Sequence, residues 1–353
     1  MASTTTANEP LEPAAQPEQS HQSQQHEPID TQIESDVRAE EDNDSAFETR
    51  SNISSTASLS ESILEYRRIH GRTYQSTKTT DYWAPNDEQQ NEGLDMIHHA
   101  LLMILDDKLL LAPIDDNLQR ALDVGTGTGI WAMDFADQYP SAEVIGTDIS
   151  PIQPAWVPPN LRFVIDDCVL EWTWPENHFD FIHLRALYGV IPDLSDLHKK
   201  AFRHTKSGGW VQHLEMDVYI ESDHVNFPPD HIFNKWADMV FECGRRTGRP
   251  FDFAHGHTLK DSLEIAGFVD VSEHKFKAPL HSWPKDPKLK DAGALLQVAF
   301  DQSLEGFGTF MFTQILGLDP HEVTVLAAAM RKESRKRSNC PWFRGTVVWG
   351  RKP

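Results

Sequence analysis

The segment ALDVGTGTGIWAMDFADQYPSAEVIGTDIS, residues 121–150, restricts the fold more than any other part of the chain. An apolar run typical of a β-strand leads into a turn with three alternating glycines, a run with helical spacing follows, and a second strand-like run ends at Asp148. Glycines at the first strand-to-helix turn of a doubly wound sheet let backbone N–H groups approach a ligand closely. The segment therefore predicts an α/β fold with a ligand at the carboxyl ends of its strands.

The rest of the chain continues this alternation of short β-rich runs and helical or irregular connections. We predict strands over residues 120–124, 143–148, 161–165, 179–184 and 209–214. Such alternation is typical of a doubly wound, mostly parallel sheet. Further strands at 269–276 and 346–349 bring the expected sheet to seven strands, and residues 94–111 have apolar side chains at helical spacing. The aromatic-rich segments 220–262 and 280–330 predict helical cap insertions over a site.

The N-terminal segment differs in composition from the remainder. Residues 1–60 carry twelve acidic side chains against Arg38 and Arg50 alone, and such a segment buries too little apolar surface to offset its ordering entropy. We therefore predict a disordered acidic extension over 1–61 and one domain over 62–353. The extension carries about −10 of the formal net charge of −22, which leaves about −12 on the rest. Direct nucleic-acid binding is not expected of so acidic a chain.

Localisation and metal content follow from what the sequence lacks. It contains no run of eighteen apolar residues and no secretory signal, so we expect a protein of the nucleus or cytoplasm that neither crosses a membrane nor is secreted. Cys168, Cys243 and Cys340 are far apart, which fits a reducing compartment. No metal is expected, because two histidine pairs lack a cysteine or carboxylate at a recognised spacing: His98 with His99, and His255 with His257.

The glycine turn alone leaves two cofactors open. The series from Gly127 through Gly129 to Ala132 fits the G-x-G-x-x-A fingerprint of dinucleotide-binding folds, and Asp148 follows about 20 residues later, where a ribose-binding acid is expected. An NAD-dependent oxidoreductase is therefore one reading. S-adenosylmethionine is the other, since it also presents a ribose and an adenine but has no pyrophosphate.

Acidic residues at three successive strand ends favour S-adenosylmethionine. Asp123 could face the ammonium and sulfonium groups, Asp148 could bind both ribose hydroxyls, and Asp166 or Asp167 could meet the adenine edge. These carboxylates suit a cationic ligand and would repel a pyrophosphate. We predict that they form the cofactor site together with the loop glycines Gly125, Gly127 and Gly129.

Longer motifs carry a resemblance to a known family. The series ALDVGTGTGIWAMDFADQYP, AEVIGTDISPIQPAWVPPNLRF, FDFIHLRAL and KSGGWVQHLEMD, with flanking pieces such as HGRTYQ and NFPPDHIFNKW, closely resembles the LaeA-like fungal methyltransferases. The resemblance spans roughly residues 65–352. It implies a class I, Rossmann-like fold, S-adenosyl-L-methionine as cofactor, and the same glycines and acids as its binding residues.

The resemblance also implies two biological roles. The family includes a nuclear regulator of secondary metabolism that works with velvet-domain proteins, and enzymes that methylate small molecules in biosynthetic pathways. Three functions thus stay open: a methyltransferase acting on a small molecule or a protein, a non-catalytic regulatory module that retains cofactor binding, and the oxidoreductase. The basic cluster Arg331–Arg337 is either a nuclear address or a solvated helix end.

Candidates for catalysis lie at the ends of the fourth and fifth predicted strands. Methyl transfer is an in-line displacement that depends mainly on positioning, and a base is needed only when the acceptor must lose a proton. His183 and Arg185 share one face of their strand, as do His213 and Glu215. We take these four as candidate catalytic residues, although a structural role is the more common one for such histidines and carboxylates. Further candidates are Tyr188, Asp217 and an aromatic set for an acceptor pocket: Phe233, Trp236, Phe241 and Trp283.

Overall fold

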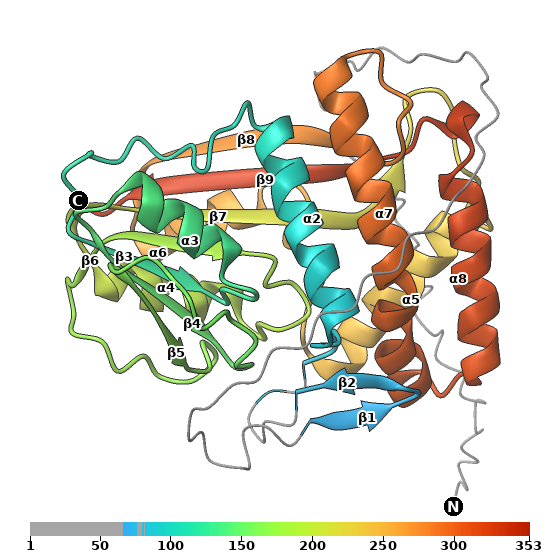
Figure 1. Ribbon diagram of the computed structural model, residues 1–353, viewed down its shortest axis with the longest axis horizontal. Helices are drawn as coiled ribbons and strands as arrows, with labels where there is room; N and C mark the ends of the chain where they lie inside the picture. The colour runs from blue at the N-terminus through green and yellow to red at the C-terminus, as the bar shows by residue number, and fades with distance from the viewer. Residues whose placement is uncertain (1–65, 76–79, 81) are drawn as a thin grey trace, which may run out of the picture.

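The computed structural model describes residues 66–75, 80 and 82–353, so the extension predicted over 1–61 lies outside the described residues. A seven-stranded sheet with the order β5-β4-β3-β6-β7-β9-β8 forms the centre of the molecule (Figure 1). Its strands are β3 (Arg120–Val124), β4 (Glu143–Asp148), β5 (Leu161–Ile165), β6 (Phe179–Arg185), β7 (Thr205–Glu221), β8 (Val269–Pro279) and β9 (Trp342–Arg351). Neighbouring strands from β5 to β7 are parallel, and β9 runs antiparallel to both β7 and β8. The predicted mostly parallel, seven-stranded fold is confirmed.

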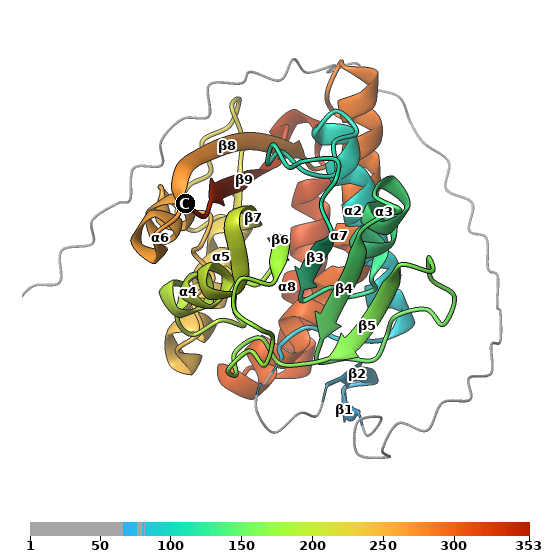
Figure 2. The same ribbon diagram turned by 90° about the vertical axis from the view of Figure 1, so that its left-hand side faces the viewer.

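Helices cover both faces of this sheet. They are α2 (Glu88–Ile104), α3 (Ile130–Gln138), α4 (Leu194–His204), α5 (Ile232–Thr247), α6 (Thr258–Ala266), α7 (Pro287–Phe310) and α8 (Pro320–Ser334). Helices α4 and α6 contact β7, β8 and β9 on one face, while α2, α3 and α7 lie on the other (Figure 2). A π-helical turn, Met311–Ile315, extends α7, and a short 3₁₀ turn, Arg337–Asn339, precedes β9. A small hairpin, β1 (Arg67–Ile69) with β2 (Arg72–Tyr74), lies before α2.

The helical insertions form the cap that the sequence predicts. Helices α5, α7 and α8 pack on one another beyond the parallel strands, and α7 lies along α2 (Figure 1). Gln90 and Ser303, both buried, join α2 to α7 through a hydrogen bond of 3.3 Å. The cap thus closes over the carboxyl ends of β3, β4 and β6, where a doubly wound sheet binds its ligands.

The bounds of three elements differ most from the predictions, each for a physical reason. The helix predicted over 94–111 begins at Glu88, because the Asp87 side chain accepts a hydrogen bond from the backbone N–H of Gln90 and caps it. It ends at Ile104, since Asp106 and Asp107 adopt positive φ angles. Strand β7 and strand β9 are far longer than predicted, because they pair with each other from Trp210↔Arg351 to Glu221↔Trp342.

Candidate cofactor and acceptor site

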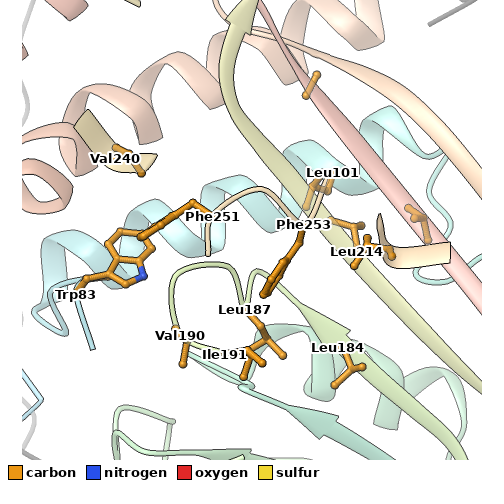
Figure 3. Close-up of a cluster of buried hydrophobic side chains, with 14 of the residues drawn as sticks. Trp83, Leu101, Leu184, Leu187, Val190, Ile191, Leu214, Val240, Phe251 and Phe253 are labelled. Carbon is orange, nitrogen blue, oxygen red and sulfur yellow. The ribbon is translucent and has the colours of Figure 1, made fainter. Parts of the chain in front are cut away.

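A cavity of about 270 Å³ lies between the carboxyl ends of the parallel strands and the cap. Polar residues line one end: Gly125, Thr126, Gly127, Thr128, Asp148, Asp166, Asp167 and Arg185. Apolar residues of the cap line the other, among them Trp236, Val240, Leu296, Phe300, Phe307 and Met311. Figure 3 shows part of this apolar wall, where Trp83 packs beside Phe251 with a ring-centroid separation of 5.4 Å. We call these two ends the polar end and the apolar chamber.

Asp148 joins the glycine loop to the end of β4. Its Oδ2 accepts a hydrogen bond from the backbone N–H of Gly127 at 2.8 Å, and its Oδ1 accepts one from Ser150 at 2.9 Å. Burial raises the pKa of this carboxyl to about 6. The carboxylate therefore borders the cavity in a fixed orientation, as a ribose-binding acid requires.

The three loop glycines have different structural tasks. All have positive φ: +70° at Gly125, +59° at Gly127 and +84° at Gly129. A Cβ at Gly127 would meet only Leu94 Cδ1, at 3.9 Å, so the backbone there faces open space that a ligand can approach. A Cβ at Gly129 would lie 2.3 Å from the ring of Phe163, and this glycine caps α3 rather than bordering the cavity.

The first predicted acid does not face the cavity. Asp123, at 3% exposure, lies behind the loop and accepts a hydrogen bond from Thr126 Oγ1 at 2.5 Å. Burial raises its pKa to about 6. The structure thus places Asp123 where it holds the loop through Thr126, and not where its carboxylate would reach an ammonium group in the cavity.

Asp166 and Asp167 both border the polar end. Asp167 has its two oxygens engaged, by Thr80 Oγ1 at 2.7 Å and by the backbone N–H of Val169 at 3.1 Å. Asp166 accepts only the backbone N–H of Asp167, at 3.0 Å, and its other oxygen has no partner among the described residues. Asp166 is therefore the better placed of the two to accept a hydrogen bond from a ligand.

Of the four catalytic candidates, Arg185 alone borders this cavity. One guanidinium nitrogen, Nη1, lies 3.0 Å from His98 Nδ1, and His98 Nε2 lies 2.8 Å from Asp134 Oδ2. Among the described residues, Arg185 is also the only Lys, Arg or His that lines the cavity. The positive charge of Arg185 therefore lies in the same part of the cavity as the acids of the polar end.

The prediction that His183 lies at the reacting centre is not supported by its position. Its ring stacks on Trp131 with centroids 3.8 Å apart and planes 12° from parallel. Neither ring nitrogen has a hydrogen-bond partner in the described part of the chain, and burial holds the pKa well below its usual range. The residue is a neutral member of the packing between β6 and α3.

His213 and Glu215, on β7, belong to a buried chain of hydrogen bonds that lies outside the cavity. His213 Nδ1 lies 2.9 Å from His198 Nε2, and its Nε2 lies 2.8 Å from Glu215 Oε1. The same Glu215 oxygen accepts the backbone N–H of Leu187 at 2.7 Å, next to Ala186 with φ +54°. Both side chains are fully buried and outside the cavity, so they position the loop after β6 and do not touch the reacting groups.

This buried pair predicts a pH dependence of stability. Burial raises the pKa of Glu215 from an ordinary 4.5 to about 8. The folded protein thus binds more protons than the unfolded chain between pH 4.5 and pH 8. The contribution of Glu215 to the free energy of unfolding is therefore complete below pH 4.5 and is lost as the pH rises through 8. From pH 6.5 to 8.5 this carboxyl should lower the free energy of unfolding by about 2 kcal/mol.

Glu215→Gln keeps the side-chain shape and cannot ionise, so the variant should lose less stability than the wild type over that interval. Urea unfolding at pH 6.5 and 8.5 measures the difference. An equal loss in both proteins would contradict a raised pKa at this position.

Several cavity residues were not predicted. Tyr82 and Trp83 come from the segment just before α2, and Phe251 from the loop after α5. The adjacent aromatic pair in DYWAP, followed by a helical pattern, was the available sequence signal. Of the predicted aromatic set, Trp236 borders the chamber, whereas Phe233, Phe241 and Trp283 pack elsewhere.

The remaining polar candidates have local partners. The basic cluster ends α8, where Arg331 Nη1 binds Glu305 at 2.7 Å and Arg335 Nη2 binds Asp301 at 2.8 Å, so part of it fastens α8 to α7. Besides His98, two more of the histidines considered as metal ligands bind carboxylates: His255 binds Asp217 at 2.9 Å, and His257 binds Glu273 at 2.7 Å. In the described part of the chain, no helix is both long and apolar enough to cross a membrane.

Comparison with known proteins identifies the family. Residues 96–273, from α2 to β8, match the model described as a methyltransferase domain. The chain belongs to this family. It is an S-adenosylmethionine-dependent methyltransferase, and the alternative of an NAD-dependent oxidoreductase is wrong.

The relatives cover most of the chain. Methyltransferase pytC of Aspergillus terreus is 39% identical over 85% of this chain and 92% of its own length. The secondary metabolism regulator LAE1 of Cochliobolus heterostrophus is 35% identical over 75% of this chain and 87% of its own length. The protein-methionine methyltransferase laeA of Emericella nidulans is 29% identical, over 76% and 72%. The predicted relation to LaeA-like proteins is confirmed.

Similar solved structures include phosphoethanolamine N-methyltransferase 2 of Haemonchus contortus in complex with S-adenosyl-L-methionine. It is 17% identical, with a TM-score of 0.47, over 80% of this chain and 62% of that one.

Proposed function

We propose that the protein transfers a methyl group from S-adenosylmethionine, bound at the polar end, to a small and largely apolar molecule held in the apolar chamber. The observation that carries this proposal is the continuity of one cavity from the glycine loop to the aromatic and aliphatic side chains of the cap. Concave sites with apolar walls and a few oriented polar groups are typical of small-molecule binding.

The residues at the polar end fit the cofactor. Asp148 would accept hydrogen bonds from the ribose hydroxyls, Asp166 would accept one from the adenine amino group, and the open space beside Gly127 admits close approach of the ligand to the backbone. The cofactor would supply a methyl group activated by a sulfonium charge. The chain's own contribution is to orient donor and acceptor and to exclude water beneath the cap.

Arg185 is assigned a binding role in place of the predicted catalytic one. The methionyl part of the cofactor carries one carboxylate, and Arg185 is the one cation bordering the cavity among the described residues. Opposite charges attract each other more strongly away from bulk water, where few other partners compete for them. We therefore expect Arg185 to bind that carboxylate.

The Arg185→Met variant should bind S-adenosylhomocysteine about 10- to 100-fold more weakly, which corresponds to losing one charged hydrogen-bonded pair. Its affinity for methylthioadenosine, which lacks the amino-acid tail, should stay within about twofold by the same reasoning. Calorimetry with both ligands measures this contrast, and the exposed Arg162→Met serves as control. Equal weakening for both ligands would show that Arg185 acts through the structure of the site.

A regulatory role is the second candidate, favoured by the similarity to secondary metabolism regulators. In that case the acceptor would be a protein side chain, or the protein would act as a non-catalytic module beside velvet-domain-type partners in the nucleus. A protein acceptor would have to insert a side chain beneath the cap. The apolar side chains that line the chamber support the small-molecule acceptor instead.

One experiment separates these roles. Purified protein is incubated with methyl-labelled S-adenosylmethionine and an extract of the source cells, and the label is then followed into small molecules and into proteins. We expect label in small molecules, absent with Asp148→Ala. Label in the protein fraction would favour the regulator that modifies proteins. Cofactor binding without any transfer would favour a non-catalytic module.

A further inference from the structure

Two tyrosines border the cavity with hydroxyls that have no hydrogen-bond partner among the described residues. Tyr82 and Tyr188 both border it, both are partly exposed, and neither hydroxyl has a hydrogen-bond partner among the described residues. The indole of Trp83 lies between them, with ring centroids 5.9 Å from each. A polar group at an apolar wall costs free energy unless a ligand or water satisfies it.

Both tyrosines line the cavity that joins the polar end to the chamber. Burial, and after it the charge of Asp148, raises the pKa of the Tyr82 phenol, which places Tyr82 near the proposed ribose-binding acid. Tyr188 contacts Phe251 in the aromatic wall, at a centroid distance of 5.7 Å. Burial raises the pKa of both phenols far above neutrality, so each keeps its proton and can donate a hydrogen bond.

No base that is left over from cofactor binding accompanies them among the described cavity residues. Asp148 and Asp166 are assigned to the cofactor, both oxygens of Asp167 are engaged, and burial raises the pKa of the Cys168 thiol to about 12. Asp217 also borders the cavity, but its side chain is fully buried against His255. An acceptor that must lose a proton during transfer would therefore find donors beside its reacting atom and no group to take that proton.

We propose that Tyr82 and Tyr188 hold the reacting oxygen of the acceptor, and that the acceptor is an apolar molecule whose reacting group enters as an oxyanion. Carboxylic acids and acidic enols or phenols share this chemistry. The inference rests on the proposed function, since it places the acceptor in the apolar chamber.

The reaction then balances without a base. A lone pair of the oxyanion forms the new O–CH₃ bond, the S–CH₃ bond breaks, and its electron pair stays on sulfur. Anion and sulfonium give two neutral groups, so surroundings of low polarity favour the products. Transfer to a neutral amine would instead leave an ammonium ion among apolar side chains, which is costly to bury.

Three probes that share a naphthalene ring and differ only in the reacting group test the acceptor class: 2-naphthoic acid, 2-naphthol and 2-naphthylamine. Initial rates are measured with methyl-labelled S-adenosylmethionine between pH 6 and 9. We expect the acid to react with the highest kcat/KM and to show no dependence on pH. The rate with 2-naphthol should rise in proportion to its ionised fraction, about tenfold per pH unit below its own pKa.

Variants test the two hydroxyls. Tyr82→Phe and Tyr188→Phe should each lower kcat/KM for 2-naphthoic acid about tenfold, as expected for one hydrogen bond to a charged group, with unchanged affinity for S-adenosylhomocysteine. Tyr139→Phe, which removes a hydroxyl bound to Gln138 outside the cavity, is the matched control.

Preference for the amine, wild-type rates in both cavity variants, or a 2-naphthol profile set by a protein group would overturn the inference. So would methyl transfer to none of the three probes by protein that binds S-adenosylmethionine. Failure to bind S-adenosylmethionine at all would instead refute the proposed function, and the two results are therefore distinguishable.

Discussion

Asp148→Ala is expected to weaken S-adenosylmethionine binding at least about 100-fold. The substitution removes two proposed hydrogen bonds from ribose hydroxyls to a carboxylate, each of which contributes roughly 1.5 kcal/mol or more. A factor of 100 corresponds to about 2.8 kcal/mol. It also leaves the backbone N–H groups of Gly127 and Ser150 without their acceptor, which loosens the loop that the cofactor contacts.

The domain should stay folded, because Asp148 has a raised pKa and its burial as an anion is itself costly. Calorimetry gives the affinity, and circular dichroism shows whether the fold is kept. Asp137→Ala on the exposed side of α3 removes the same charge away from the cavity and should bind normally. Affinity within twofold of wild type in Asp148→Ala would refute the position of the ribose.

Gly129→Ala is expected to lower the free energy of unfolding by roughly 3 kcal/mol. The residue has φ +84°, which costs a non-glycine residue about 1 kcal/mol or more. The added Cβ would lie 2.3 Å from the partly buried ring of Phe163, and overpacking of this kind costs roughly 1–3 kcal/mol. Movement of the ring would disturb the packing between the loop and β5.

Gly208→Ala is the matched control. Gly208 has nearly the same φ, +81°, but a Cβ there meets nothing within 4 Å. Gly208→Ala should therefore lower the free energy of unfolding only by the cost of backbone strain, about 1 kcal/mol. Urea unfolding of both variants separates strain from packing, and equal losses would show that Phe163 moves aside without cost.

Strands β3, β4, β5 and β6 were predictable from the sequence to within about one residue. The runs 143–148 and 161–165 each contain a short apolar stretch, 144–146 and 163–165, that is flanked by polar or charged residues, so their patterns are distinct. Strand β7 was predicted too short, because His213, Glu215 and Asp217 give it a polar face. Each of these side chains has a hydrogen-bond partner on α4 or in a neighbouring loop, which local sequence patterns do not reveal.

The candidate site was predictable where it depends on strand ends. Asp148 and Asp166 border the cavity because the carboxyl ends of parallel strands meet at one edge. Alternation showed that His213 and Glu215 share a face but not which helices cover it, and these two side chains lie away from the cavity. Tyr82 precedes the sheet in the chain, and only the packing of the cap brings it to the cofactor end.

The separation of the cavity into a cofactor end and an acceptor chamber is tested most directly by filling the chamber. Val240, on α5, is buried at 3% exposure and lines the chamber far along the chain from the glycine loop (Figure 3). For Val240→Phe, the account predicts an unchanged dissociation constant for S-adenosylhomocysteine and at least about a tenfold loss of label transfer to the small-molecule fraction. Undiminished transfer by a variant with a filled chamber would contradict the account.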